Sequence, residues 1–121
     1  MGVLVAISIP IFTNQLEKSR EAVDEANVRS LYAETVSAVL AEDTDAKTDI
    51  KDATLTVNVD GGVYTGVATL KLSQQKNGLE GGKTSVNIGG IDVPSGQWGA
   101  NKTMTITVKS DGTKTTITSG T

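Results

Sequence analysis

The chain has 121 residues, with 11 lysine and arginine residues against 14 aspartate and glutamate residues, a formal net charge of −3. It has no histidine and no cysteine, which excludes imidazole general bases, histidine or thiolate metal sites and disulfides. With one Phe, one Trp and two Tyr it has few aromatic rings for stacking on bases, so nucleic acid is not expected as the main partner.

Residues 1–43 are predicted to form one long helix. They contain no glycine after Gly2 and no proline after Pro10, and they are rich in Ala, Leu, Glu and Val. The uncharged run 2–12 is shorter than the roughly 20 apolar residues that span a bilayer, so it is either a buried segment or the end of a longer one. Pro10 is expected to kink this helix, because it removes one backbone hydrogen bond.

The helix carries two stripes of side chains with different periods. The first advances in alternating steps of four and three, the period of 3.5 that is typical of a coiled-coil seam; its members are Phe12, Leu16, Ser19, Val23, Ala26 and Ser30. The second is the wider band of a helix lying on a core; its members are Val28, Leu31, Tyr32, Thr35, Val36 and Val39.

The two stripes lie on different faces of the helix, and one chain supplies one sheet. We therefore assign the second stripe to the helix–sheet core and the first, the seam, to packing against another molecule. Contact between the seam and a loop of the same chain is the alternative.

Charged side chains lie between the stripes and are expected to form a solvated face with weak i,i+4 pairs, Arg20 with Asp24 and Glu25 with Arg29. The full set is Glu17, Lys18, Arg20, Glu21, Asp24, Glu25 and Arg29.

Residues 42–52 form an acidic loop. Its Asp43, Asp45 and Asp49 could suggest calcium, but the loop lacks the glycine and the closing glutamate of an EF-hand, so no metal is predicted.

Residues 53–121 hold 12 of the 13 glycines in short alternating runs and read as antiparallel sheet. Turn signals at 60–62 and 110–112 separate these runs, and the second predicts a carboxy-terminal hairpin. The expected strands are 54–59, 63–72, 84–88, 103–108 and 113–118, with a helix as the alternative for 63–72. The fold class is therefore α+β, one long amino-terminal helix packed on a small antiparallel sheet of about four strands.

Chemical motifs are few. The glycines at 78, 81 and 82 fit no phosphate-binding loop. Trp98 is either an exposed binding aromatic or a cover for the sheet. An enzyme would need a carboxylate pair such as Asp92 with Asp111 in a cleft, so we predict no catalytic residue and no cofactor.

The start of the chain, GVLVAISIPIF at 2–12 followed by QLEKSREA at 15–22, resembles the amino-terminal helix of type IV pilins. The segment DEANVRSLYAE at 24–34 resembles pilins of Gram-positive, clostridia-like bacteria. The resemblance covers about residues 2–42. It implies a type IV pilin-like fold in which 1–43 is the long pilin helix, 1–12 the remnant of its membrane and filament-core segment, and 44–121 the loop and sheet head.

The resemblance also implies a function and partners. The protein would be a structural subunit of an extracellular type IV pilus that serves adhesion, surface (twitching) motility or DNA uptake. Its partners would be further pilin subunits, the pilus assembly machinery and, before assembly, the cytoplasmic membrane. A basic leader and an FTLxE segment would precede Gly2, so the chain is expected to be amino-terminally truncated.

Two alternatives stay open. A pseudopilin of a type II secretion or competence system would use the same helix. An adhesive or sugar-binding β-domain would rest on Trp98 and on the threonine-rich face of the sheet.

Overall fold

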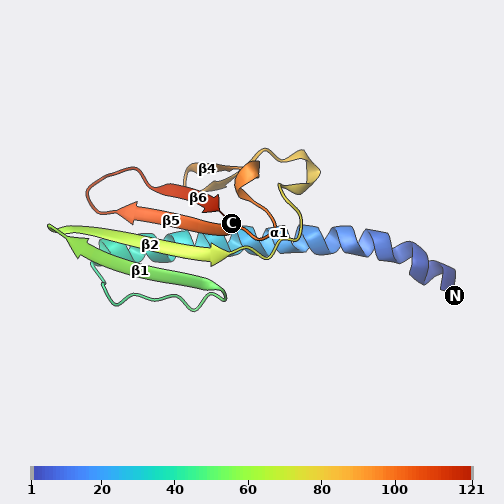
Figure 1. The fold of residues 1–121 in the computed structure, drawn as a ribbon, viewed down its shortest axis with the longest axis horizontal. Helices are drawn as coiled ribbons and strands as arrows, with labels where there is room; N and C mark the ends of the chain where they lie inside the picture. The colour runs from blue at the N-terminus through green and yellow to red at the C-terminus, as the bar shows by residue number, and fades with distance from the viewer. Residues whose placement is uncertain (1, 121) are drawn as a thin grey trace.

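The computed structural model describes the backbone of residues 2–120 and the side chains of residues 15–120. The predicted kink at Pro10, the place of Phe12 in the seam and the apolar run 1–12 lie outside the described side chains. One helix is followed by two small sheets (Figure 1). The elements are α1 (Gly2–Leu40), β1 (Ala53–Asp60), β2 (Val63–Lys71), η1 (Glu80–Gly82), β3 (Ser85–Ile88), β4 (Ile91–Pro94), η2 (Ser95–Gln97), β5 (Thr103–Lys109) and β6 (Thr116–Gly120).

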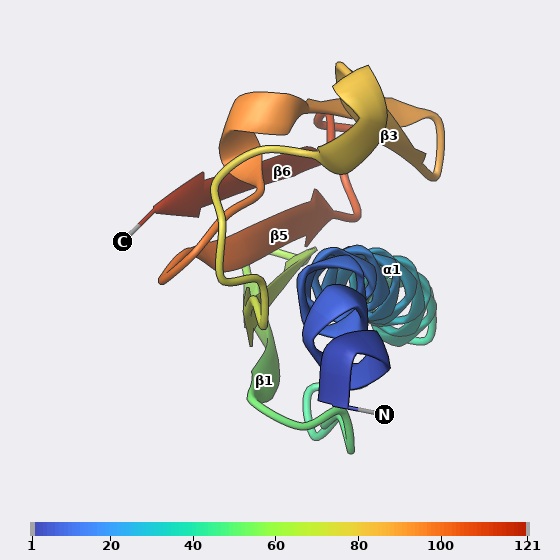
Figure 2. The same cartoon turned by 90° about the vertical axis from the view of Figure 1, so that its right-hand side faces the viewer.

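The main sheet has four antiparallel strands in the order β1-β2-β5-β6. Helix α1 lies along one face of it, and the separate β3–β4 hairpin lies beside β6 (Figure 2). The α+β class and the four-stranded antiparallel sheet predicted from the sequence are thus confirmed. The predicted carboxy-terminal hairpin is also confirmed, as β5 paired with β6.

Alternation of side chains along the strands builds the core on the face that meets the helix. Leu55 and Val57 of β1 are buried, whereas Thr54 and Thr56 between and beside them are exposed. Strand β5 repeats the pattern, with Met104 and every second residue after it buried. The outer face is threonine-rich, as expected from the sequence.

The helix meets this apolar face through the second stripe. Val28, Leu31 and Val39 are buried, and Tyr32 and Val36 pack against the same core. Burying such aliphatic side chains stabilises the fold by about 1.5–3 kcal/mol each.

A glycine in β2 sets how closely the helix approaches the sheet. A Cβ atom at Gly66 would lie 2.7 Å from Cγ2 of Val39 and 2.9 Å from Cγ2 of Thr35. Both atoms belong to β-branched side chains, whose rotamers have little freedom in a helix. Gly66 therefore lets the helix and the sheet come into direct contact.

We expect Gly66→Ala to destabilise the protein by about 1–3 kcal/mol, the usual cost of overpacking a core. Urea unfolding followed by circular dichroism measures this change. Gly120→Ala is the matched control, because no atom lies within 4 Å of a Cβ placed there. Equal stability of the two variants would contradict the close packing described here.

The strand expected over 63–72 is confirmed, and its helix alternative is not, because residues 63–71 pair as β2 with both β1 and β5. Two other local details differ from the expectation. Strand β4 was not expected. Strand β6 begins at Thr116 rather than Thr113, because Asp111 Oδ1 accepts a hydrogen bond from the Thr113 backbone and extends the turn.

Candidate assembly surface

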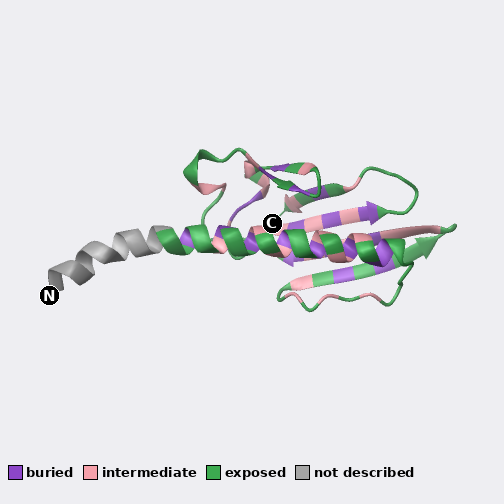
Figure 3. Ribbon diagram, turned by 180° about the vertical axis from the view of Figure 1, so that it is seen from behind, coloured by how far each residue is buried: buried purple, intermediate pink, exposed green. Residues whose placement is uncertain are grey.

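One face of helix α1 stays uncovered along the length of the head (Figure 3). Leu16 and Val23 are 39% and 52% exposed. Ser19, Ala26 and Ser30, which share this face, are exposed as well. No loop of the described chain covers these five seam residues, so the alternative of an intramolecular seam is not what the structure shows.

The opposite face holds an unexpected group of acids. Glu17, Glu21 and Asp24 are buried, with 2%, 5% and 1% of their surface exposed. The expectation that they belong to a solvated face was wrong. They follow one another in steps of four and three and lead directly into buried Val28 and Leu31, so they extend the buried stripe toward the amino terminus.

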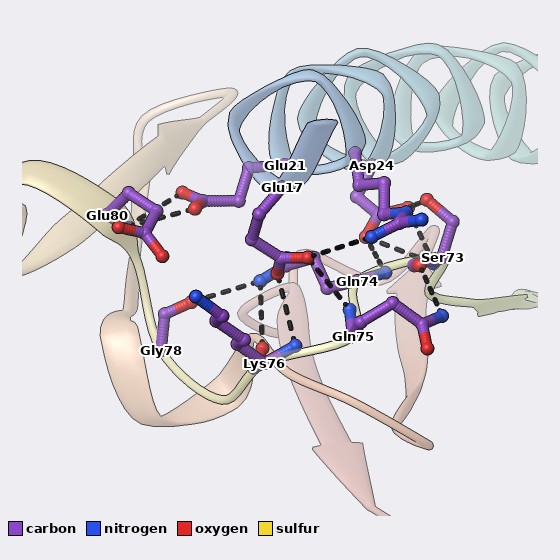
Figure 4. Close-up of polar contacts among 10 residues, drawn as sticks. Glu17, Glu21, Asp24, Ser73, Gln74, Gln75, Lys76, Gly78 and Glu80 are labelled. Carbon is purple, nitrogen blue, oxygen red and sulfur yellow. Dashed lines mark hydrogen bonds and ion pairs between the residues drawn. The ribbon is translucent and has the colours of Figure 1, made fainter. Parts of the chain in front are cut away.

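These three side chains, which we call the carboxylate clamp, bind the backbone of residues 73–80, which we call the strap (Figure 4). Asp24 Oδ1 accepts hydrogen bonds from the backbone N–H and the hydroxyl of Ser73, at 2.8 and 2.7 Å. Its Oδ2 accepts one from the Gln74 N–H at 3.0 Å. One carboxylate therefore satisfies three donors.

The other two carboxylates hold the rest of the strap. Glu17 accepts the N–H of Gln75 and the N–H of Lys76, each at 3.1 Å and each with a different oxygen. Both carboxylate oxygens of Glu21 accept a hydrogen bond from the Glu80 N–H, each at 3.0 Å. Most of the strap has no sheet partner, so the clamp supplies acceptors that its amides would otherwise lack.

The side chain of Gln74 makes a hydrogen bond within the strap. Its side chain is buried, and its Nε2 donates to the Gly78 carbonyl at 3.0 Å. The strap therefore folds around an internal hydrogen bond, and the helix side chains hold it in place.

Cationic side chains contribute little to the clamp. Arg20 Nη1 lies 3.5 Å from Glu17 Oε1, and Lys83 Nζ lies 2.8 Å from Glu25 Oε1. The predicted pairs, Arg20 with Asp24 and Glu25 with Arg29, were wrong. Asp24 instead accepts hydrogen bonds from the strap, and Glu25 pairs with Lys83. Such partly exposed pairs are worth about 0.2–1 kcal/mol.

Burial raises the pKa of two clamp residues. For Glu21, loss of hydration is the main cause, opposed by the hydrogen bond from Glu80 and reinforced by nearby glutamates. For Asp24, loss of hydration again outweighs the hydrogen bonds from Ser73 and Gln74, and the charge of Glu17 adds to the rise in pKa.

We therefore expect these two groups to stabilise the fold as the pH falls. A folded-state pKa above the unfolded one means that the folded protein binds more protons. The stabilisation from Glu21 and Asp24 is complete below their unfolded values, near 4.5 and 3.8, and is lost as the pH rises through the folded values.

Thermal melts of the wild type and of Glu21→Gln, from pH 7 down to about pH 4, test this prediction. The melting temperature of the wild type relative to the variant should rise on acidification. A relative fall over the same range would contradict it.

A groove of about 590 Å³ lies at the carboxy-terminal end of the helix, between its exposed face and the acidic loop. Ala33 and Ser37 contribute from the helix and Ala41 from the turn after it, and the charged residues of the lining are the acids Glu34, Asp43 and Asp45 and the base Lys47. Leu55 of β1 also lines it.

The remaining candidate residues, Trp98, Asp92 and Asp111, form no ligand-binding or catalytic site in the described part of the chain. Trp98 is fully buried and its Nε1 donates to the Val93 carbonyl at 3.3 Å, so it covers the sheet core and is no exposed binding aromatic. Asp92 and Asp111 are both exposed. Within residues 15–120, no group of three or more acids is placed to hold a metal ion.

Comparison with known proteins found no family model, no curated protein and no solved structure that matches this chain. Over the part of the chain that the structure describes, no helix combines the length and the apolar character needed to cross a membrane.

Proposed function

We propose that this protein is a structural subunit of an extracellular filament, a type IV pilin that assembles by helix–helix packing with further copies of itself. Its partners would be those copies and the pilus assembly machinery, with a membrane stage before assembly. The filament would stand on the cell surface and serve adhesion, surface motility or DNA uptake.

The exposed seam is the observation that supports this proposal. Single exposed apolar residues are ordinary on protein surfaces. Here Leu16 and Val23 share one face with small residues at coiled-coil spacing, while the opposite side of the same helix is fully engaged by the sheet and the strap. Small side chains let helices approach closely, and the 3.5-residue period keeps one face toward a partner.

The alternatives have less support. A pseudopilin would use the same surface, and no separate observation favours it. The sugar-binding domain rested on Trp98 and on the threonine-rich face of the sheet, and it loses the first of these supports because Trp98 is buried.

A charge placed in the seam tests the proposal. Val23→Asp should weaken self-association of the chain at least tenfold, because an unpaired carboxylate buried in an interface costs well over the ~1.4 kcal/mol that corresponds to that factor. Sedimentation equilibrium over a concentration series measures the association constant.

Thr56→Asp, on the exposed outer face of β1, is the matched control and should associate like the wild type. A wild-type chain that stays monomeric to millimolar concentration, or equal association of Val23→Asp and wild type, would overturn the proposal.

A further inference from the structure

Strand β1 is an outer strand of the main sheet, and one of its edges has no strand beside it. The Asp52 carbonyl accepts a hydrogen bond from the Lys71 N–H, so the backbone of residue 52 points toward β2. In an antiparallel ladder the N–H and C=O of one residue point to the same side, and successive residues alternate. The backbone groups of Leu55, Val57 and Val59 therefore point away from β2, to the free edge.

The segment that runs alongside this edge does not pair with it. The acidic loop 42–52 lies next to β1 (Figure 1), and its Lys47 and Thr48 line a cavity of about 290 Å³ together with residues 53–56 of the strand. No backbone hydrogen bond from the described loop reaches Leu55, Val57 or Val59. The edge groups of these three residues are therefore free to bind another backbone.

Strand β1 also lacks the features that usually protect an outer strand from pairing, which are charges, prolines, bulges and short length. It has eight residues, its register with β2 is regular from end to end, and residues 53–59 contain no proline and no charge. The other outer strand, β6, has five residues, and Gln97 Oε1 accepts the Ser119 N–H at 2.6 Å. The two edges of the sheet thus differ, and β1 has the open one.

Two hollows flank this edge, one on each side of the sheet. The groove of about 590 Å³ beside the helix has Leu55 on its lining, and the cavity of about 290 Å³ has Thr54 and Thr56. Successive side chains of a strand point to opposite faces. An added strand would therefore direct one set of side chains toward the helix groove and the other set toward the threonines.

The surroundings of the edge are acidic. Residues 42–60 contain six acids and two bases, all exposed, which gives a net charge of 2 − 6 = −4. Neither base, Lys47 or Lys51, forms an ion pair with a described residue. Asp52 and Asp60 lie at the two ends of the strand. Complementary charge attracts a partner and suppresses the wrong ones, so a basic partner fits this edge.

We propose that β1 binds an extended, basic peptide segment of another protein by strand addition, with backbone hydrogen bonds to Leu55, Val57 and Val59. Main-chain hydrogen bonds supply the affinity in this mode of recognition, and the hollows for alternate side chains supply the specificity. This inference goes beyond the proposed function and does not depend on it, because the edge is complete within one chain.

Strand β1 of a second copy is a poorer occupant. The antiparallel register centred on Thr56 would place Asp52 of each copy opposite Asp60 of the other. Like charges directly opposite each other destabilise a pair of strands. The same two acids favour a peptide that carries a base near each end.

Amide hydrogen exchange of the full chain, followed by NMR, tests the proposal. The probe is a blocked peptide of eight residues, the length of β1, with alternating threonine and valine between terminal lysines. At saturating peptide, exchange of the Leu55, Val57 and Val59 amides should slow at least tenfold. The Thr54 and Thr56 amides should not change, because they already point toward β2.

Two control peptides separate the backbone from the charge. One has glutamate in place of both lysines, and the other is N-methylated at every threonine and valine, so that it keeps its charge and loses those donors. Both should bind at least fivefold more weakly than the lysine peptide. In the chain, Val59→Pro removes one edge N–H at a half-exposed position and should weaken binding at least fivefold, whereas Val59→Thr keeps the N–H and should bind like the wild type.

Each contrary result overturns a stated part of the proposal. Equal binding of the N-methylated peptide, or of Val59→Pro and Val59→Thr, would overturn strand addition and leave attraction to the acidic loop. Equal binding of the glutamate peptide would overturn the basic partner. Slow exchange of the three edge amides in the free chain, increasing with its concentration, would assign the edge to a second copy. No slowed exchange at millimolar lysine peptide would overturn the site, while the association constant of the Val23→Asp chain tests the proposed function separately.

Discussion

Val39→Asp is expected to unfold the protein or to bring its melting temperature close to ambient. Val39 is 2% exposed and belongs to the cluster between the helix and the sheet. An unpaired carboxylate there costs several kcal/mol, a large part of the roughly 5–15 kcal/mol that stabilises a typical domain. Thermal melts followed by circular dichroism measure the loss.

Val23→Asp is the matched control on the same helix. Because 52% of Val23 is exposed, a carboxylate at this position is hydrated in the monomer and should leave the melting temperature within a few degrees of the wild type. If Val23→Asp lowered the melting temperature as much as Val39→Asp, the seam would be intramolecular and the assembly surface would be assigned to the wrong face.

Asp24→Ala should have the second largest effect, about 2–5 kcal/mol of lost stability. The change leaves the N–H groups of Ser73 and Gln74 and the Ser73 hydroxyl without their acceptor. A buried donor left unpaired costs about 1–3 kcal/mol; the Gln74 N–H is such a donor, and the two Ser73 donors are partly buried. Urea unfolding gives the total, and amide hydrogen exchange should show faster exchange in the strap with little change in β5.

Asp49→Ala is the control for removing an acid. Asp49 is exposed in the loop after the helix, so its loss should change stability by about 0.5 kcal/mol or less. Unchanged exchange of the Ser73 and Gln74 amides in Asp24→Ala would contradict the role given to the clamp.

The helix and the main sheet could be predicted because their signals are local. Absence of glycine and proline from residues 11–40 marks the helix, and alternation such as Leu55 and Val57 between threonines marks a half-buried strand. The buried positions Val28, Leu31 and Val39 follow from the helical period for the same reason.

The carboxylate clamp could not be predicted from residue type, because isolated acids are almost never fully buried. Its acceptors are needed only because the strap has no sheet partner, which is a property of the tertiary structure. A signal was nevertheless present: Glu17, Glu21 and Asp24 continue the steps of three and four that lead into Val28. Strand β4 was missed because it is short, ends at Pro94 and follows two glycines.

Immunogold electron microscopy tests the central claim most directly. An antibody raised against residues 53–120 would be applied to unfixed cells that produce the protein from its own gene. We predict gold particles along the length of surface filaments, and loss of those filaments in cells that carry Val23→Asp while the protein itself persists. Label absent from the cell surface, or filaments that persist unchanged with Val23→Asp, would contradict the assignment of this protein as a filament subunit.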